Sequence, residues 1–177
     1  MRKILLALVA LSLFAAAPAH AQQPQKIGLI NLQKLMLESA PAAEAKKKME
    51  ANFSAEKKEI DKKSEELKKM SEQLRLQSAA LTPEAREDKK VDFVRMKRDL
   101  EDQARTFTRK VQAADAQIRQ DILTVIAKAC SEYGKKQGFA AIFDATHAGV
   151  AYADPALDVT SEVMVEVNRI WRAGAKK

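Results

Sequence analysis

The chain has 177 residues, of which 31% are charged and only 5% aromatic, and its formal net charge is +7. Its single cysteine, Cys130, cannot form an internal disulfide, and the one histidine beyond the first 21 residues, His147, has no Cys/His cluster around it to suggest a zinc site. No glycine-rich phosphate-binding motif is present either. Composition therefore argues against a nucleotide, a metal or another cofactor, and we predict that the protein is not an enzyme.

The first 21 residues have the organisation of a secretory signal peptide. Arg2 and Lys3 precede an apolar run over residues 4–17, and small residues flank His20 directly after it. We predict cleavage between Ala21 and Gln22 and export from the cytoplasm. An uncleaved anchor is the alternative, but the run is short for the roughly 30 Å of hydrocarbon that a helix must cross.

Residues 42–136 are predicted to form two long helices. Pro83 is the only proline or glycine between residues 42 and 133, and Ala, Lys, Glu, Gln and Arg are abundant there. Thr82 is placed to cap the second helix, with Pro83 in its first turn, so the tip of the hairpin falls at residues 78–82.

Apolar residues recur at heptad spacing in both helices. In the first helix they are Phe53, Ile60, Leu67, Leu74 and Leu81. A companion row is interrupted by Glu56, Lys63 and Gln77. In the second helix spacings of three and four relate Leu100, Ala104, Phe107, Val111, Ala114, Ile118 and Val125. This pattern predicts an antiparallel coiled coil whose thin seam allows the arm to bend.

The two ends of the chain are predicted to form a small α/β body. Residues 26–32 read as one strand, and residues 139–143 as a second, after Gly134 and Gly138 end the long helix. Residues 150–153 read as a third strand, joined to the second by a turn around residues 147–149.

A last helix follows, which Asp158 is predicted to cap. Its expected buried face carries Val163, Val167, Ile170 and Trp171. A body of this size is only marginally stable by itself, and its sheet would have open edges. We therefore predict an obligate homo-oligomer.

Three segments at the chain ends carry a family resemblance. They are residues 26–34 (KIGLINLQK), 139–145 (FAAIFDA) and 150–160 (VAYADPALDVT), and with them the chain resembles the Skp/OmpH family of periplasmic chaperones. The resemblance implies a mostly α, jellyfish-like homotrimer in which the body forms an intersubunit β-barrel and the hairpins are tentacles around a cavity. The expected division is a signal peptide at 1–21, a trimerisation body at 22–41 and 137–177, and a tentacle at 42–136.

The function that the resemblance implies is that of an ATP-independent holdase for unfolded outer-membrane β-barrel precursors. Apolar residues expected off the seam, Leu76, Val94 and Met96, are candidate client contacts, although isolated exposed apolar residues are common on ordinary surfaces. Further candidates are Lys46, Lys47, Lys48, Lys57, Lys58, Lys62, Lys63, Lys68 and Lys69. Such charge runs are also typical of solvated helix faces.

Charge is unevenly distributed, with 23 Lys and Arg against 18 Asp and Glu in residues 42–136. The tip segment 71–95 is balanced, with five of each sign, so the positive excess lies below the tip. The positive excess should attract anionic partners in a salt-dependent way. The family resemblance also points to contact with anionic phospholipid or lipopolysaccharide.

Two other functions fit part of the pattern. A structural coiled-coil envelope protein would favour a regular, well-filled seam, which Glu56, Lys63 and Gln77 interrupt. A basic nucleic-acid binder fits the charge, but the export signal, the few aromatic residues and the interleaved acidic residues argue against specific nucleic-acid binding.

Overall fold

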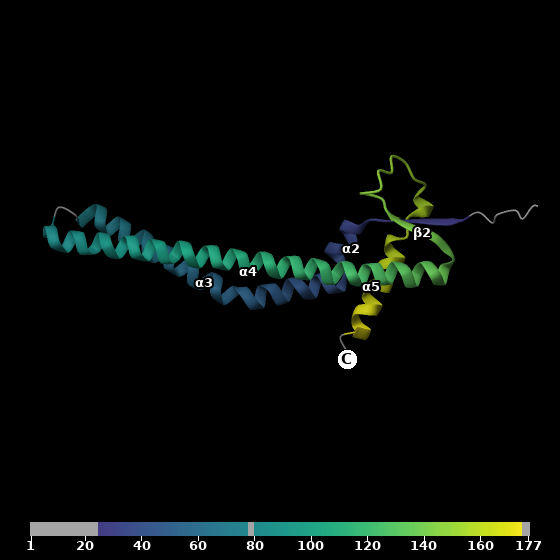
Figure 1. The fold of residues 1–177 in the computed structure, drawn as a ribbon, viewed down its shortest axis with the longest axis horizontal. Helices are drawn as coiled ribbons and strands as arrows, with labels where there is room; N and C mark the ends of the chain where they lie inside the picture. The colour runs from purple at the N-terminus through teal and green to yellow at the C-terminus, as the bar shows by residue number, and fades with distance from the viewer. Residues whose placement is uncertain (1–24, 78–79, 175–177) are drawn as a thin grey trace, which may run out of the picture.

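The computed structural model describes residues 25–77 and 80–174. Two long helices form a rod, and a small body lies at one end of it (Figure 1). In chain order the elements are β1 (Lys26–Ile30), α2 (Leu32–Glu38), α3 (Ala40–Gln77), α4 (Pro83–Gln137), β2 (Phe139–Asp144), the 3-10 turn η2 (Pro155–Leu157) and α5 (Thr160–Gly174). The predicted cleavage point between Ala21 and Gln22 lies outside the described residues.

The predicted helical hairpin is confirmed. Thr82 caps α4 by accepting a hydrogen bond from the Ala85 amide, and Pro83 occupies the first turn. At the other end Gly138 has a left-handed φ of 71° and donates its N–H to the Gly134 carbonyl. Gly134 itself lies within α4, so the prediction that it helps to end the helix is wrong. It is buried instead, because β2 packs closely over it through Ile142.

The heptad residues lie where α3 faces α4, as the spacing predicts. Phe53, Ile60, Leu67 and Leu74 are all half-buried. Phe53 meets Phe107 of α4 edge-to-face, with ring centroids 5.9 Å apart and an interplanar angle of 85°. The two helices are therefore joined by separated apolar layers.

The sheet of the body contains two parallel strands in the described part of the chain. Gly28 pairs with Ile142, and a Cβ at Gly28 would meet the Phe139 ring at 3.0 Å and the Val159 side chain at 3.1 Å, so a larger residue there would push these neighbours aside. The predicted third strand, residues 150–153, is not a strand: turns occupy 145–149 and irregular backbone follows. The edge of β1 away from β2 is taken by Asp158, which forms a bridge with Leu29. Among the residues that the structure describes, 150–153 have no strand partner.

A short helix replaces the predicted end of the first strand. Asn31 accepts a hydrogen bond from the Lys34 amide at 2.8 Å and thereby caps α2, so the strand stops at Ile30 rather than at residue 32. Asp158 is not the residue directly before α5, which is Val159, so the predicted cap is displaced by one residue. The Asp158 carboxylate still accepts the Thr160 amide at 2.8 Å, in the turn that leads into the helix.

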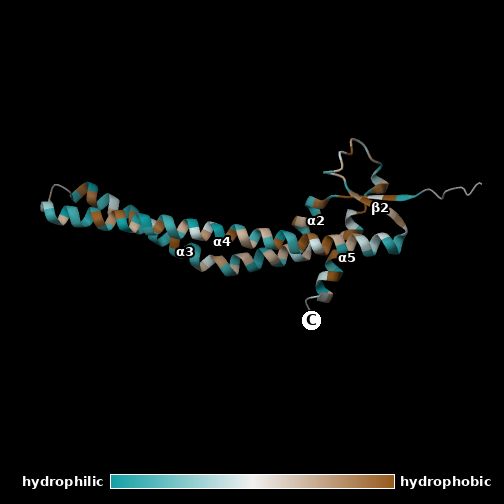
Figure 2. Cartoon of the chain, in the orientation of Figure 1, coloured by the Kyte–Doolittle hydropathy of each residue, from teal (hydrophilic) through white to brown (hydrophobic). Residues whose placement is uncertain are grey.

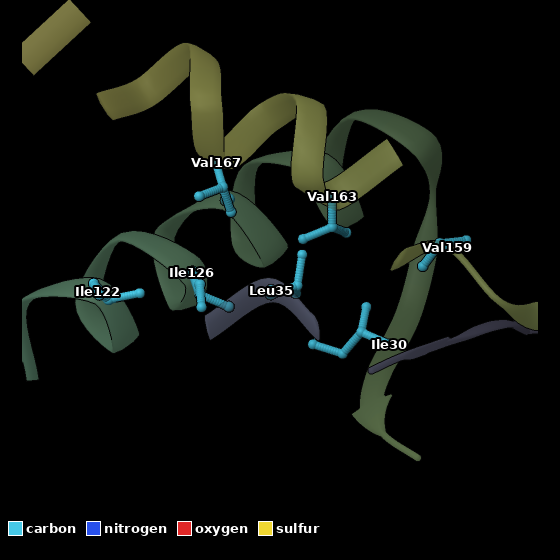
Figure 3. Close-up of a cluster of buried hydrophobic side chains, with 8 residues drawn as sticks. Ile30, Leu35, Ile122, Ile126, Val159, Val163 and Val167 are labelled. Carbon is cyan, nitrogen blue, oxygen red and sulfur yellow. The ribbon is translucent and has the colours of Figure 1, made fainter. Parts of the chain in front are cut away.

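The core of the body joins β1, α2, α4 and α5 (Figure 3). Its buried residues are Ile30, Leu35, Ile122, Ile126, Ala129, Val159, Val163 and Val167. Three of them belong to α4, within the range 42–136 predicted for the hairpin. The lower end of α4 is therefore part of the body, and the rest of the helix projects from it.

Among the residues that the model describes, none of the helices combines the length and the apolar character required to cross a bilayer.

Candidate functional site

The outer faces of the hairpin carry exposed apolar side chains. Leu76 is 64% exposed on α3, and Val94 is 43% exposed on α4. Sequence reasoning missed Val91, which is 49% exposed and lies one turn before Val94 on the same face of α4. Val91 could have been found from the sequence, because it lies three residues before Val94 and therefore on the same side of the helix, away from the seam. The ribbon of the rod is hydrophilic over much of its length, with hydrophobic segments in between (Figure 2).

A shallow groove on α4 surrounds the valine pair. Lys90, Arg95 and Arg98 line it together with Glu87 and Asp99. Lys90 pairs with Glu87 at 3.4 Å, so part of the basic charge is neutralised locally. The groove can offer apolar contact at its centre and polar contact at its rim, without a deep binding pocket.

Met96 does not lie on this surface. It is half-buried and borders the same cleft between the helices as Met70 of α3 and Gln103 of α4. The prediction that Met96 lies off the seam is therefore wrong. Its heptad relation to Gln103, seven residues later, was the available clue.

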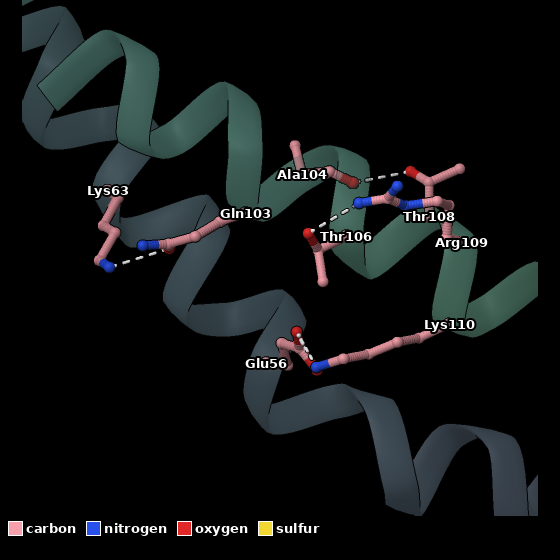
Figure 4. A network of polar contacts seen from close by, with 8 residues as sticks. All are labelled: Glu56, Lys63, Gln103, Ala104, Thr106, Thr108, Arg109 and Lys110. Carbon is pink, nitrogen blue, oxygen red and sulfur yellow. Dashed lines mark hydrogen bonds and ion pairs between the residues drawn. The ribbon is translucent and has the colours of Figure 1, made fainter. Parts of the chain in front are cut away.

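Eight of the nine candidate lysines are exposed on α3. Lys63 is the exception, because it is half-buried and donates to Gln103 Oε1 across the hairpin at 2.9 Å (Figure 4). Nearby, Lys110 of α4 reaches Glu56 of α3 at 2.9 Å. Glu56 and Lys63, two of the three polar residues that interrupt the seam, thus have partners on the opposite helix, and Lys63 is part of the contact between the helices.

The exposed lysines repeat with a period that sequence reasoning missed. The pairs Lys46–Lys47, Lys57–Lys58 and Lys68–Lys69 are spaced 11 residues apart. Eleven residues are close to three helical turns, so the pairs lie on one side of α3 about 16 Å apart. Within the described residues no carboxylate lies within 4.0 Å of these six ammonium groups, whereas Lys48 and Lys62 have acidic neighbours.

His147 lies in the turn after β2, as the sequence suggests, and its Nδ1 pairs with Asp144. Burial raises the pKa of Asp144, but hydrogen bonds from His147 and from the Thr146 and Leu32 amides outweigh it, and the net pKa is lowered. In the described part of the chain, no three His, Cys, Asp or Glu side chains gather as a metal site.

Comparison with known proteins places this architecture. A family model described as "Outer membrane protein (OmpH-like)" matches residues 26–167. A protein named "Chaperone protein Skp" from Yersinia enterocolitica is 25% identical over 160 residues, covering 86% of this chain and 92% of that protein. Its namesake from Pectobacterium atrosepticum is 24% identical over 157 residues, covering 89% and 94%.

A solved structure shares the fold. It is a putative outer membrane chaperone (OmpH-like) from Caulobacter crescentus, with a TM-score of 0.69 and 12% sequence identity, and the match covers 88% of this chain and 91% of that one. The family model matches most of the chain and confirms the resemblance carried by the chain ends. The chain belongs to the Skp/OmpH family.

Proposed function

We propose that this protein is an ATP-independent periplasmic holdase that binds unfolded outer-membrane β-barrel precursors and prevents their aggregation. The single observation that carries the proposal is the exposure of Leu76, Val91 and Val94 on a long hairpin that projects from a small body. Unfolded barrel strands aggregate through exposed apolar residues, and scattered weak contacts would cover them while allowing release. The names of the Skp relatives support the same function.

The proposed assembly is a homotrimer whose bodies share an intersubunit β-barrel, with the hairpins around a client cavity. The body of one chain exposes Ile27, Phe143, Val150 and Tyr152 around its two-stranded sheet, and Tyr152 is 86% exposed. Open strand edges and exposed apolar residues favour pairing with identical chains. Three hairpins on one body would present each weak contact three times, which raises the effective concentration for one client.

Export supports the periplasmic location. The proposed mature protein begins at Gln22, after cleavage behind Ala21. The three lysine pairs on α3 form a surface that would also attract anionic phospholipid or lipopolysaccharide. Binding to vesicles of anionic phospholipid, but not of phosphatidylcholine, that weakens between 50 and 300 mM salt would support this contact. Equal binding to both vesicle types would exclude it.

The holdase proposal is tested by dilution. An unfolded outer-membrane barrel protein is diluted from urea, without ATP, in the presence of the mature chain, and turbidity is recorded. We expect suppression at a threefold molar excess of the chain. Replacing Leu76, Val91 and Val94 by serine should raise the concentration of chain needed for the same suppression by roughly tenfold, because the hairpin of every subunit loses these contacts.

The matched control is Val165→Ser, which removes an apolar side chain at least as exposed as those of the hairpin from α5 of the body. This variant should protect the client as the parent does. If the parent leaves turbidity unchanged, the proposed function is wrong. If Val165→Ser and the hairpin variant behave alike, the hairpin surface is not the contact.

A further inference from the structure

The root of each long helix is the end that lies at the body. At the root of α3, the serine that precedes the helix does not cap it. Ser39 separates α2 from α3 with extended backbone at φ −72° and ψ 158°. A serine at this position commonly caps the helix that follows. Here the Ser39 side chain is fully buried, and its Oγ has no hydrogen-bond partner among the described residues. Pro41, also buried, has no N–H to contribute.

The missing cap comes from α5, at the other end of the chain. Asn168 accepts a hydrogen bond from the Ala40 amide at 2.7 Å, across 128 residues of sequence. One turn further along both helices, the Trp171 indole donates to Glu44 at 2.8 Å. The hydrogen bonds from Trp171 and then Lys48 lower the pKa of Glu44, so this acceptor is ionised at neutral pH. Two polar contacts from one side of α5 therefore hold the first turns of α3.

The root of α4 is attached to α5 in a different way. Ile122 and Ile126 pack against Val163 and Val167 in the buried core, so the attachment is mainly apolar (Figure 3). Arg169 adds an ion pair to Glu132 at 2.7 Å. The contact of Trp171 with Glu44 borders an open groove, and the ion pair of Arg169 with Glu132 borders the same groove. Water can reach and replace these two contacts, but α4 also has Ile122 and Ile126 buried in the core, which makes the α3 root the more easily released of the two.

Two rods joined along a seam bend when the root of one slips past the root of the other. On α3 the apolar half-buried residues below Phe53 are Ala42, Ala45 and Met49. Ala42 and Ala45 pack against the body core, but their small side chains interlock little with α4 and so resist slip only weakly. We propose that Asn168 and Trp171 of α5 form a latch on α3, and that release of this latch lets the α3 root move along α4 and changes the curvature of the arm. If the proposed holdase function holds, the latch would set the width of the client cavity.

The latch is tested by spin-label distances in the full mature chain carrying Cys130→Ala. One pair, Ala51→Cys with Ser161→Cys, reports α3 against α5; the other, Ala113→Cys with Ser161→Cys, reports α4 against α5. All three label sites are exposed. Labelled chains are diluted into unlabelled chains so that only distances within a chain contribute. No client is present, so failure of the holdase proposal leaves the measurement valid.

Asn168→Ala combined with Trp171→Phe removes both contacts and retains an aromatic ring. We expect the α3 distance to shift or broaden by roughly 3–5 Å, up to one helical turn, while the α4 distance stays as in the parent. Asn168→Asp and Glu44→Gln keep an acceptor oxygen and should resemble the parent. Unchanged α3 distances would overturn the latch. Equal broadening of both pairs would also overturn it, since α5 would then be an ordinary part of one core.

Discussion

The hairpin and the body of this protein bury their side chains to different depths. Between residues 42 and 121 none of the described side chains is fully buried, whereas Leu35, Val163 and Val167 of the body are completely inaccessible. Apolar burial is the main stabilising contribution in both regions, so the body should be the stable unit and the hairpin the adaptable one. This division suits the proposed holdase, whose hairpin would have to fit different unfolded chains.

The largest expected effect comes from the body core. Leu35→Ala removes a fully buried side chain and should lower the free energy of unfolding by about 2–5 kcal/mol. Urea denaturation followed by circular dichroism measures the loss. The matched control, Leu76→Ala, changes an exposed leucine of α3 and should stay within about 0.5 kcal/mol of the parent. Equal losses of unfolding free energy in the two variants would show that the body is not the more stable region.

A smaller, local effect is expected from the seam. Phe53→Ala deletes the edge-to-face contact with Phe107 and should cost about 1–2 kcal/mol, since the ring is only half-buried. Hydrogen exchange should quicken in amides of α3 and α4 around this layer, while amides of β1 and α5 keep their protection. Faster exchange throughout the chain would mean that hairpin and body unfold together.

The polar contacts of the seam should contribute less to the free energy of unfolding than the Phe53 layer does. Glu56 and Lys110 are partly exposed, so their ion pair is expected to stabilise the hairpin by about 0.3–1 kcal/mol. A double-mutant cycle with Glu56→Lys and Lys110→Glu measures the coupling. The doubly reversed variant should recover most of the stability lost by each single change. Independent, additive losses would show that the contact does not align the two helices.

The smallest expected effect is on pH dependence at the root. The pKa of Glu44 is lowered by hydrogen bonds from Trp171 and Lys48, and that of Glu166 by its bond with Arg169, each from an ordinary value of 4.5. Carboxylates with a lowered folded pKa stabilise the protein above the unfolded value and lose this contribution as pH falls through the folded one.

Thermal unfolding midpoints should therefore be level from pH 7 to about 5 and fall below about pH 4.5. Glu166→Gln should flatten part of that fall, and Glu59→Gln, an exposed change in the middle of α3, should not. If the unfolding midpoint already declines above pH 6, groups other than these two carboxylates control the loss of stability in acid.

The hairpin was predictable because its determinants are local in sequence. Heptad spacing, Thr82 and Pro83 specify two helices and the turn between them. The lysine period of 11 was equally visible in the sequence. Met96 was misplaced because apolar positions were assigned to the seam from Leu100 onward, and the seam continues toward the tip.

The body was harder to predict because its determinants lie far apart in the sequence. The alternation at residues 150–153 is strand-like, but whether it pairs depends on a partner edge, and Asp158 occupies the free edge of β1. Asn31 fits the end of a strand or a helix cap, and its bond to Lys34 decides for the cap. The contacts of Asn168 and Trp171 with α3 span more than 120 residues and have no sequence signature.

The central claim is that small bodies associate so that projecting hairpins enclose one unfolded client. Native mass spectrometry of the mature chain, alone and after dilution of one barrel precursor from urea, tests it most directly. The account predicts three subunits alone and three subunits with one client in the complex. A single chain in both samples, with no client retained, would contradict it.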